Sequence, residues 1–182
     1  MTPTVRNAFL AAEEPNFYVR SPISPLIDIA RGVIFNHQPR SSAISAAVTR
    51  CLMALSPSCC GKHIDRAIGQ IVLQGRVEKT WSKDRIFELY LNETWLGRGA
   101  YGAAAAAHAY FGKQVSELTI DEAAYLAGLA RAPNYLGRVN ERGAQRRNVV
   151  IDRMEEAGTI SSPEAASAKQ QPLLLREARA PI

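Results

Sequence analysis

The stretch of sequence that decides the fold is SKDRIFELYLNETWLGRGAYGAAAAAHAYFGK, residues 82–113. Ile86, Leu89 and Tyr90 recur at the spacing of one helical face, and Ser82 stands where a helix N-cap is expected. Three closely spaced glycines follow, and an alanine-rich segment comes after them. Glycine permits tight turns and alanine favours helix, so this stretch predicts a helix, a tight loop and a second helix.

The rest of the chain also shows helical periodicity. No segment alternates apolar and polar residues with the period of two that marks a strand. Further helices are expected up to Glu14–Pro15, around 29–34, over 44–52, from 64 toward Glu78, from the capping box of Thr119 and Glu122 to Pro133, from Asn140 to Gly158, and from Ser162–Pro163 onward. The sequence therefore predicts an all-α fold.

The composition is that of a globular protein with an excess of positive charge. The chain has 182 residues, of which 47% are hydrophobic, and a formal net charge of +5. This length suits one core, so we expect a single domain over residues 1–182, with the apolar but irregular segment 20–40 as a small lobe. The charge favours an anionic partner, such as a phosphorylated substrate, an acidic membrane surface or nucleic acid.

Cysteine usage and apolar runs exclude several classes of protein. Cys51, Cys59 and Cys60 are odd in number and include an adjacent pair, which argues against a disulfide framework and against structural zinc. No run reaches the roughly 18 apolar residues that a membrane span needs, and the N-terminus lacks a signal-peptide layout. We therefore expect a soluble chain as given, with any anchor lying upstream.

Three sequence blocks match a known family closely. AFLAAEEPNFY (8–18) is similar to the family's AFIAIEDxxFY and keeps its glutamate as Glu13. The opening stretch, 82–113, and ELTIDEAAYLAGLARAP (117–133) are nearly intact blocks, and the tail continues the likeness to near residue 168. The chain thus resembles the family 51 glycosyltransferases, the peptidoglycan polymerases that make glycan strands from lipid II.

Two further blocks depart from the family pattern. The second, RSSAISAA (40–47), lacks the glycines and glutamines of the family's GGSTITQQ but keeps Ser42. The third, RAIGQ (66–70), keeps Arg66 and has Gln70 in place of a glutamate. Gln70 has the shape of glutamate, but its amide carries no charge and exchanges no proton usefully.

The resemblance implies an all-α, lysozyme-like lobe with a reduced jaw at residues 20–40. In the family this jaw touches the membrane, so Val33, Ile34 and Phe35 are expected to do so here. The implied reaction is an inverting glycosyl transfer. An acceptor hydroxyl attacks the anomeric carbon of a lipid-linked disaccharide, and polyprenyl pyrophosphate leaves.

The resemblance also assigns roles to individual residues. Glu13 is the expected general base, and Gln70 occupies the place of the second catalytic glutamate. Substrate binding falls to Glu14, Phe17, Ser42, Arg50 and Arg66. Arginine forks match phosphate oxygens, so Arg50 and Arg66 are expected at the leaving pyrophosphate. A divalent cation, Mg²⁺ or Mn²⁺, is an alternative source of positive charge, and no metal ligand is assigned.

Three functional hypotheses stay open at this point. The first is a glycosyltransferase, active or weakened, that polymerises lipid II into the nascent glycan strand. The second is an inactive module that binds lipid II, glycan or cell-wall synthesis proteins, which Gln70 and the altered second block motivate. The third is a lysozyme-like lytic enzyme. The expected location is the extracytoplasmic, periplasmic face of the bacterial inner membrane if an upstream anchor exists, and nucleic acid is not an expected partner.

Overall fold

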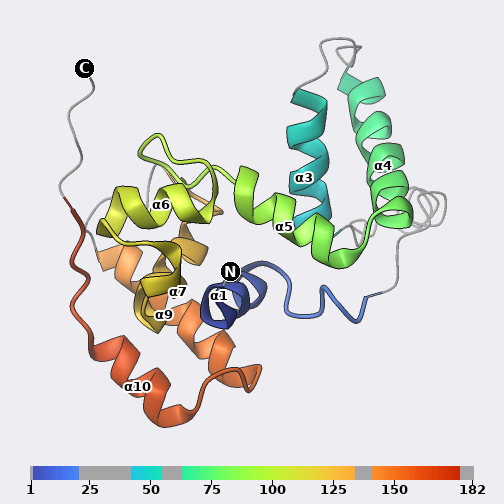
Figure 1. Cartoon of the computed structure of the whole chain (residues 1–182). Helices are drawn as coiled ribbons and strands as arrows, with labels where there is room; N and C mark the ends of the chain where they lie inside the picture. Colours follow the sequence, from blue (N-terminus) through green and yellow to red (C-terminus); the bar gives the residue numbers. More distant parts are fainter. Residues whose placement is uncertain (1, 21–41, 55–62, 134–140, 177–182) are drawn as a thin grey trace. The chain divides into compact units, whose positions relative to one another are not determined.

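The computed structural model describes residues 2–20, 42–54, 63–133 and 141–176 (Figure 1). For residues 63–68 it describes the backbone alone. Within these ranges the regular structure consists of helices and one isolated β-bridge, which confirms the all-α prediction. The chain divides into two compact units, which are described separately: unit 1 is Met1–Pro15 with Thr94–Ile182, and unit 2 is Asn16–Glu93.

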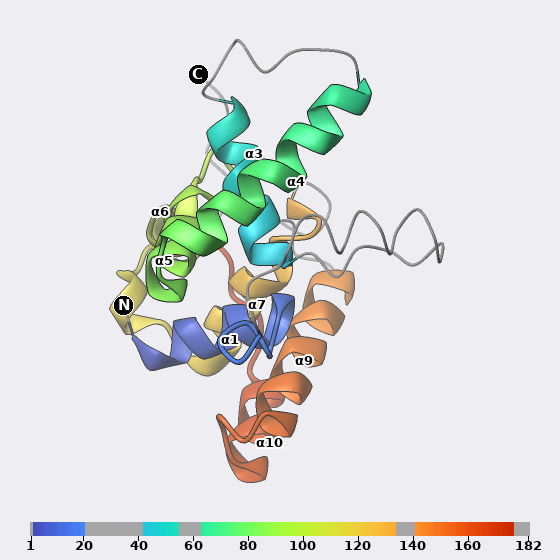
Figure 2. The same cartoon turned by 90° about the vertical axis from the view of Figure 1, so that its right-hand side faces the viewer.

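Unit 1 is built around helix α7 (Ile120–Leu129), whose sequence IDEAAYLAGL is apolar almost throughout. Eight of its ten residues are buried. Helices α1 (Pro3–Glu13) and α9 (Glu141–Glu156) pack against it, and both views show the three helices side by side (Figure 1 and Figure 2). A helix that is apolar on nearly every side needs to be enclosed, so α7 forms the core of this unit.

Three shorter elements complete unit 1: α6 (Gly102–Phe111), the 3₁₀ helix η2 (Val115–Glu117) and α10 (Ser162–Gln170). Helix α10 packs on α9, while α6 contacts both α7 and η2. The sequence did not predict η2, because a single 3₁₀ turn is too short to show a periodicity.

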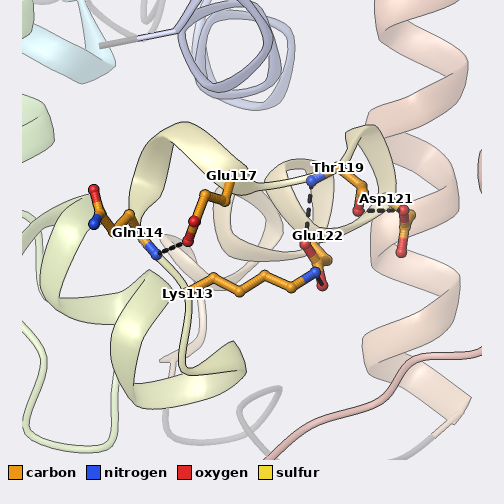
Figure 3. A network of polar contacts seen from close by, with 6 residues as sticks. All are labelled: Lys113, Gln114, Glu117, Thr119, Asp121 and Glu122. Atoms are coloured by element: carbon orange, nitrogen blue, oxygen red, sulfur yellow. Dashed lines mark hydrogen bonds and ion pairs between the residues drawn. The ribbon is translucent and has the colours of Figure 1, made fainter.

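Polar contacts fix the start of α7 (Figure 3). The backbone N–H of Thr119 donates to Glu122 Oε2 at 3.1 Å within a capping box, which confirms the predicted box. The other carboxylate oxygen of Glu122 pairs with Lys113 Nζ at 2.7 Å. Gln114 and Glu117 form a second box around η2. These contacts hold the loop after α6 against the first turn of α7.

The glycine loop before α6 closes through hydrogen bonds. The N–H of Leu96 donates to the Ala100 carbonyl at 3.0 Å, and the N–H of Ala100 donates to the Gly97 carbonyl at 2.8 Å. The buried Tyr110 hydroxyl donates to the Leu96 carbonyl at 2.8 Å, which fastens the loop to α6. This geometry needs Gly97, whose φ of +84° is one that L side chains rarely adopt.

Unit 2 contains helices α3 (Ala43–Ala54), α4 (His63–Thr80) and α5 (Lys83–Glu93), with α3 packed against both of the others. The N–H of Arg85 donates to Ser82 Oγ at 3.2 Å, so Ser82 caps α5 as predicted. The aromatic rings of Phe87 and Tyr90, from one face of α5, stack with centroids 6.2 Å apart. Ile86 and Tyr90 of the predicted face are buried together with Phe87 and Leu91, whereas Leu89 is partly exposed.

Several expectations fall outside the described residues. These are residues 21–40 of the expected jaw with its short helix, Cys59 and Cys60, and the Asn140 cap. In the described part of unit 2, Cys51 is a free, partly exposed thiol. Among the residues that the structure describes, no helix is long and apolar enough to cross a membrane.

Replacing Gly97 with alanine is expected to lower the free energy of unfolding by about 2–3 kcal/mol. The left-handed backbone accounts for about 1–2 kcal/mol, and the disturbed hydrogen bond of Tyr110 for about 1 kcal/mol more. The new Cβ would lie 2.7 Å from Tyr110 Oη. Urea unfolding followed by circular dichroism measures this loss.

Gly99 provides the matched control for this prediction. Its φ is +74°, but a Cβ there would meet nothing within 4 Å. Gly99→Ala is therefore expected to cost about 1–2 kcal/mol from the backbone alone. Equal losses for the two variants would show that the contact with Tyr110 does not constrain the loop.

Candidate functional site

Glu13 is the last residue of α1, and the buried face of that helix fixes its place. Val5, Phe9 and Ala12 recur at helical spacing and are fully buried, and the helix packs against α7 and α9. Pro15 disfavours a helical conformation in the residue before it, so the helix ends here. The Glu13 side chain, 10% exposed, is thereby held at the C-terminal end of α1.

Three arginines act electrostatically on the Glu13 carboxylate: Arg131, which follows α7, and Arg146 and Arg153 on α9. Arg131 Nε lies 3.7 Å from Glu13 Oε1, so this contact is an ion pair beyond hydrogen-bonding distance. Arg153 Nη1 donates to the Ala12 carbonyl at 3.0 Å. That bond satisfies a free carbonyl at the end of α1 and places a cation where the helix dipole favours one.

The pKa of Glu13 is raised above its ordinary value. Burial is the larger cause, because removal from water disfavours the charged form of the carboxyl group, and the three arginines lower the pKa in part. Among the described residues, Glu13 Oε1 is buried and has no hydrogen-bond donor. A desolvated carboxylate with cations around it and one oxygen unoccupied has the properties of a general base.

Phe17 lies in the core of unit 2 and is fully buried. Its ring centroid lies 5.3 Å from that of Tyr18 and 6.0 Å from that of Phe87. Lys83 Nζ lies over the ring, 4.6 Å from its centroid. These contacts give Phe17 a packing role, and a direct contact with substrate stays a prediction.

The altered second and third blocks meet within unit 2. Ser42 is fully buried and begins α3, because its Oγ accepts the N–H of Ser45 at 3.1 Å. Gln70, on α4 and partly buried, places Nε2 at 3.5 Å from the Ala46 carbonyl, which is a long hydrogen bond. Substrate binding by Ser42 and a catalytic role for Gln70 stay predictions.

The other predicted substrate-binding residues are dispersed. Arg50 is exposed on α3, and Arg66 lies on α4 with its side chain outside the described part. Glu14 is partly exposed and follows α1, so it belongs with Glu13 to unit 1. The structure therefore groups Glu13 with arginines that the sequence did not single out.

A bound Mg²⁺ or Mn²⁺ would need a cluster of oxygen ligands. Within the described ranges, no group of three or more His, Cys, Asp or Glu side chains is arranged to hold a metal ion. Mg²⁺ and Mn²⁺ prefer several oxygen ligands, which these ranges do not bring together. No chemical step is therefore assigned to a metal.

Sequence reasoning missed Arg131, Arg146 and Arg153. One signal was present, because Arg146 and Arg153 stand seven residues apart, and that spacing puts two residues on the same face of a helix. What the spacing does not reveal is which helix that face covers. Only the packing of α9 on α1 and α7 brings both residues to Glu13.

These observations define an all-α protein with a buried glutamate, flanked by arginines, at the end of its first helix. The sequence profile of the family described as Transglycosylase matches residues 1–155, and the chain belongs to this family. The family resemblance that the sequence blocks indicated is thus confirmed.

Individual relatives agree with this assignment. Penicillin-binding protein 1A of Aquifex aeolicus is 39% identical over 176 residues, which cover 95% of this chain and 24% of that protein. A proposed transglycosylase from Cupriavidus necator is 39% identical over 171 residues, covering 93% of this chain and 74% of the relative. The crystal structure of penicillin-binding protein 1A from Haemophilus influenzae matches 55% of this chain and 15% of its own, with a TM-score of 0.50 and 44% identity. The chain thus spans about a quarter of the Aquifex protein's length.

Because burial raises the pKa of Glu13, its ionised form destabilises the folded state at neutral pH. The folded protein binds more protons than the unfolded chain between the unfolded and the folded pKa of this group, so its contribution to stability falls as pH rises through that window. Glu13→Gln is therefore expected to raise the free energy of unfolding at neutral pH by about 0.5–2 kcal/mol.

The gain from Glu13→Gln should disappear in acid, below the unfolded pKa, where wild-type Glu13 is protonated in both states. Thermal unfolding of both proteins across the pH range measures this difference. A gain that does not change with pH would contradict the electrostatic explanation.

Proposed function

We propose that this chain is a peptidoglycan glycosyltransferase that polymerises lipid II into glycan strands with Glu13 as general base. The observation that carries the proposal is the buried, arginine-flanked carboxylate at the family's first sequence block. Membership of the Transglycosylase family and the likeness to penicillin-binding proteins 1A support it. The two units would act together as one transglycosylase domain.

The proposed step is a direct displacement. Glu13 accepts the proton of a sugar hydroxyl on the acceptor, and that oxygen forms a bond to the anomeric carbon of the donor. The bond between the anomeric carbon and the pyrophosphate oxygen breaks, and the oxygen leaves with the electron pair. The configuration at carbon inverts because attack and departure occur on opposite faces.

The leaving pyrophosphate requires positive charge. Arg131 offers such charge in unit 1, because its side chain is 55% exposed although it pairs with Glu13. Arg50 is exposed in unit 2, and Arg66 keeps the residue type of the family's third block. Arginine suits this role because its planar fork donates two hydrogen bonds to phosphate oxygens at once.

Gln70 supports a second candidate function, an inactive module that binds lipid II, glycan strands or cell-wall synthesis proteins. An amide at this position cannot supply the charge or the proton of a glutamate. The glycosyltransferase remains the primary proposal because Glu13 retains both its residue type and a tuned environment. Measured activity separates the two candidates.

The proposed partners are lipid II and the growing glycan strand. The proposed location is the extracytoplasmic face of the bacterial inner membrane, with the jaw at residues 20–40 touching the membrane surface. The net charge of +5 supports contact with anionic lipid. Penicillin-binding proteins 1A among the relatives support a place in cell-wall synthesis.

Glu13→Gln is expected to reduce polymerisation of labelled lipid II by about 10²–10⁴-fold, because it removes the proton acceptor while keeping the side-chain shape. Gel separation of the glycan products in detergent measures the rate. Glu156→Gln, an exposed change at the end of α9, is the matched control and should leave the rate unchanged. Equal rates for wild type and Glu13→Gln would remove Glu13 from the mechanism.

Gln70→Glu is expected to increase the polymerisation rate by about 10²-fold, at the lower end of what one acid–base group contributes. The change restores the carboxylate of the family pattern at a position where glutamate and glutamine have the same shape. The same lipid II assay measures it, with Lys79→Gln as control, because it makes the same change in net charge at an exposed position of the same helix. An unchanged rate would show that Gln70 is not what limits the reaction.

A further inference from the structure

Two buried polar atoms in unit 1 have no hydrogen-bond partner among the described residues. One is Oε1 of Glu13, and the other is Nη2 of Arg146. Each residue acts electrostatically on the other, and both belong to helices that pack together, α1 and α9. Buried polar atoms are usually paired, so two opposite charges left incompletely bonded call for an explanation.

The stem of Arg146, on α9, passes close to Gly128 on α7. A Cβ at Gly128 would lie 3.0 Å from Arg146 Cγ, so the missing side chain leaves room for the arginine stem. Arg146 is only partly exposed, and burial lowers its pKa, as do the charges of Arg131 and Arg153. Glu13 is the group that favours its charged form. The Glu13 carboxylate therefore offsets the cost of burying this cation, but only in part.

The other two arginines are placed differently. Arg131 lowers the pKa of Glu13 the most of the three, although its side chain is 55% exposed and partly screened by water, and Arg153 donates to the Ala12 carbonyl through Nη1. Arg146 combines a partly buried side chain with an Nη2 group that has no acceptor in the described part. In a poorly hydrated setting, a nearby opposite charge has its largest effect on the ionisation of a carboxyl group.

We propose that Arg146 is a positioning residue whose half-buried guanidinium keeps the Glu13 carboxylate ionised and ready to accept a proton. The catalytic consequence of this interaction rests on the proposed function. The electrostatic coupling between Arg146 and Glu13 does not depend on that function. Gly128 takes part by leaving room beside α7 for the arginine stem. Arg146 touches no reacting atom in this scheme and acts through Glu13.

Among the described residues, three charged groups act on Glu13 from the elements packed against α1, and all are cations: Arg131, which follows α7, and Arg146 and Arg153 on α9. Burial raises the pKa of Glu13, and the charge of Arg146 lowers it. Removing that charge should therefore raise the pKa of Glu13 further. The acid limb of the pH–rate profile should follow, because a general base works only when deprotonated.

The test is a direct titration of Glu13 in the full chain, by ¹³C NMR with labelled glutamate and with Glu13→Gln to assign the signal. Arg146→Gln should move the titration midpoint to higher pH. Arg142→Gln removes the same charge from an exposed position of the same helix and should leave the midpoint unchanged. Arg146→Lys keeps the charge and should stay close to wild type.

An unchanged midpoint in folded Arg146→Gln overturns the proposal, as does an equal shift in Arg142→Gln. If Arg146→Gln does not fold, Arg146→Met decides, because it removes the charge and keeps an apolar stem of similar length beside Gly128. That variant should raise the midpoint, and no shift would overturn the proposal. In the lipid II assay, Arg146→Gln should lose more activity at acidic than at alkaline pH.

The titration midpoint of Glu13 tests the electrostatic coupling, and the lipid II assay tests the proposed function. If the wild type is inert but Arg146→Gln raises the midpoint, the proposed function fails and the coupling stands. If the wild type is active but the midpoint does not move, the coupling fails and the function stands.

Discussion

The enclosure of α7 is the constraint on which unit 1 depends. Its sequence is apolar on almost every side, so α1 and α9 must cover it to keep that surface from water. Helix α1 ends in Glu13, and α9 carries Arg146 and Arg153. The packing that forms the core therefore also brings a carboxylate and its cations together. The candidate site is a consequence of core packing rather than of a flexible surface loop.

The same packing imposes an electrostatic cost. Burying a carboxylate is unfavourable unless opposite charge and hydrogen bonds compensate, and here Oε1 has charge nearby but no donor among the described residues. Arg153 adds a bond to the end of the helix rather than to the carboxylate. Stability is thus incompletely optimised around Glu13, which is common where a group must stay available for chemistry.

Much of the fold was predictable because its signals are local. Ser82 and the pair of Thr119 and Glu122 mark helix starts within four residues, and both caps are confirmed. The 3₁₀ helix η2 was missed because it is too short to carry a pattern. The site was predictable only in part: Glu13 stands in a recognisable block, whereas Arg153 meets the end of α1 across 141 positions of sequence. No local pattern reports such a contact, which depends on how three helices pack.

The larger departures from the family pattern fall in unit 2, whereas the blocks that build the core of unit 1 are nearly intact apart from Glu14 in place of an aspartate. The altered positions still serve the local structure. Ser42 caps α3, and the side-chain amide of Gln70, on α4, donates to the Ala46 carbonyl on α3. Glutamine at position 70 carries no charge. Its partial burial between α3 and α4 therefore costs less desolvation free energy than a glutamate would. We therefore expect any effect of the missing second carboxylate to appear in the chemistry rather than in folding.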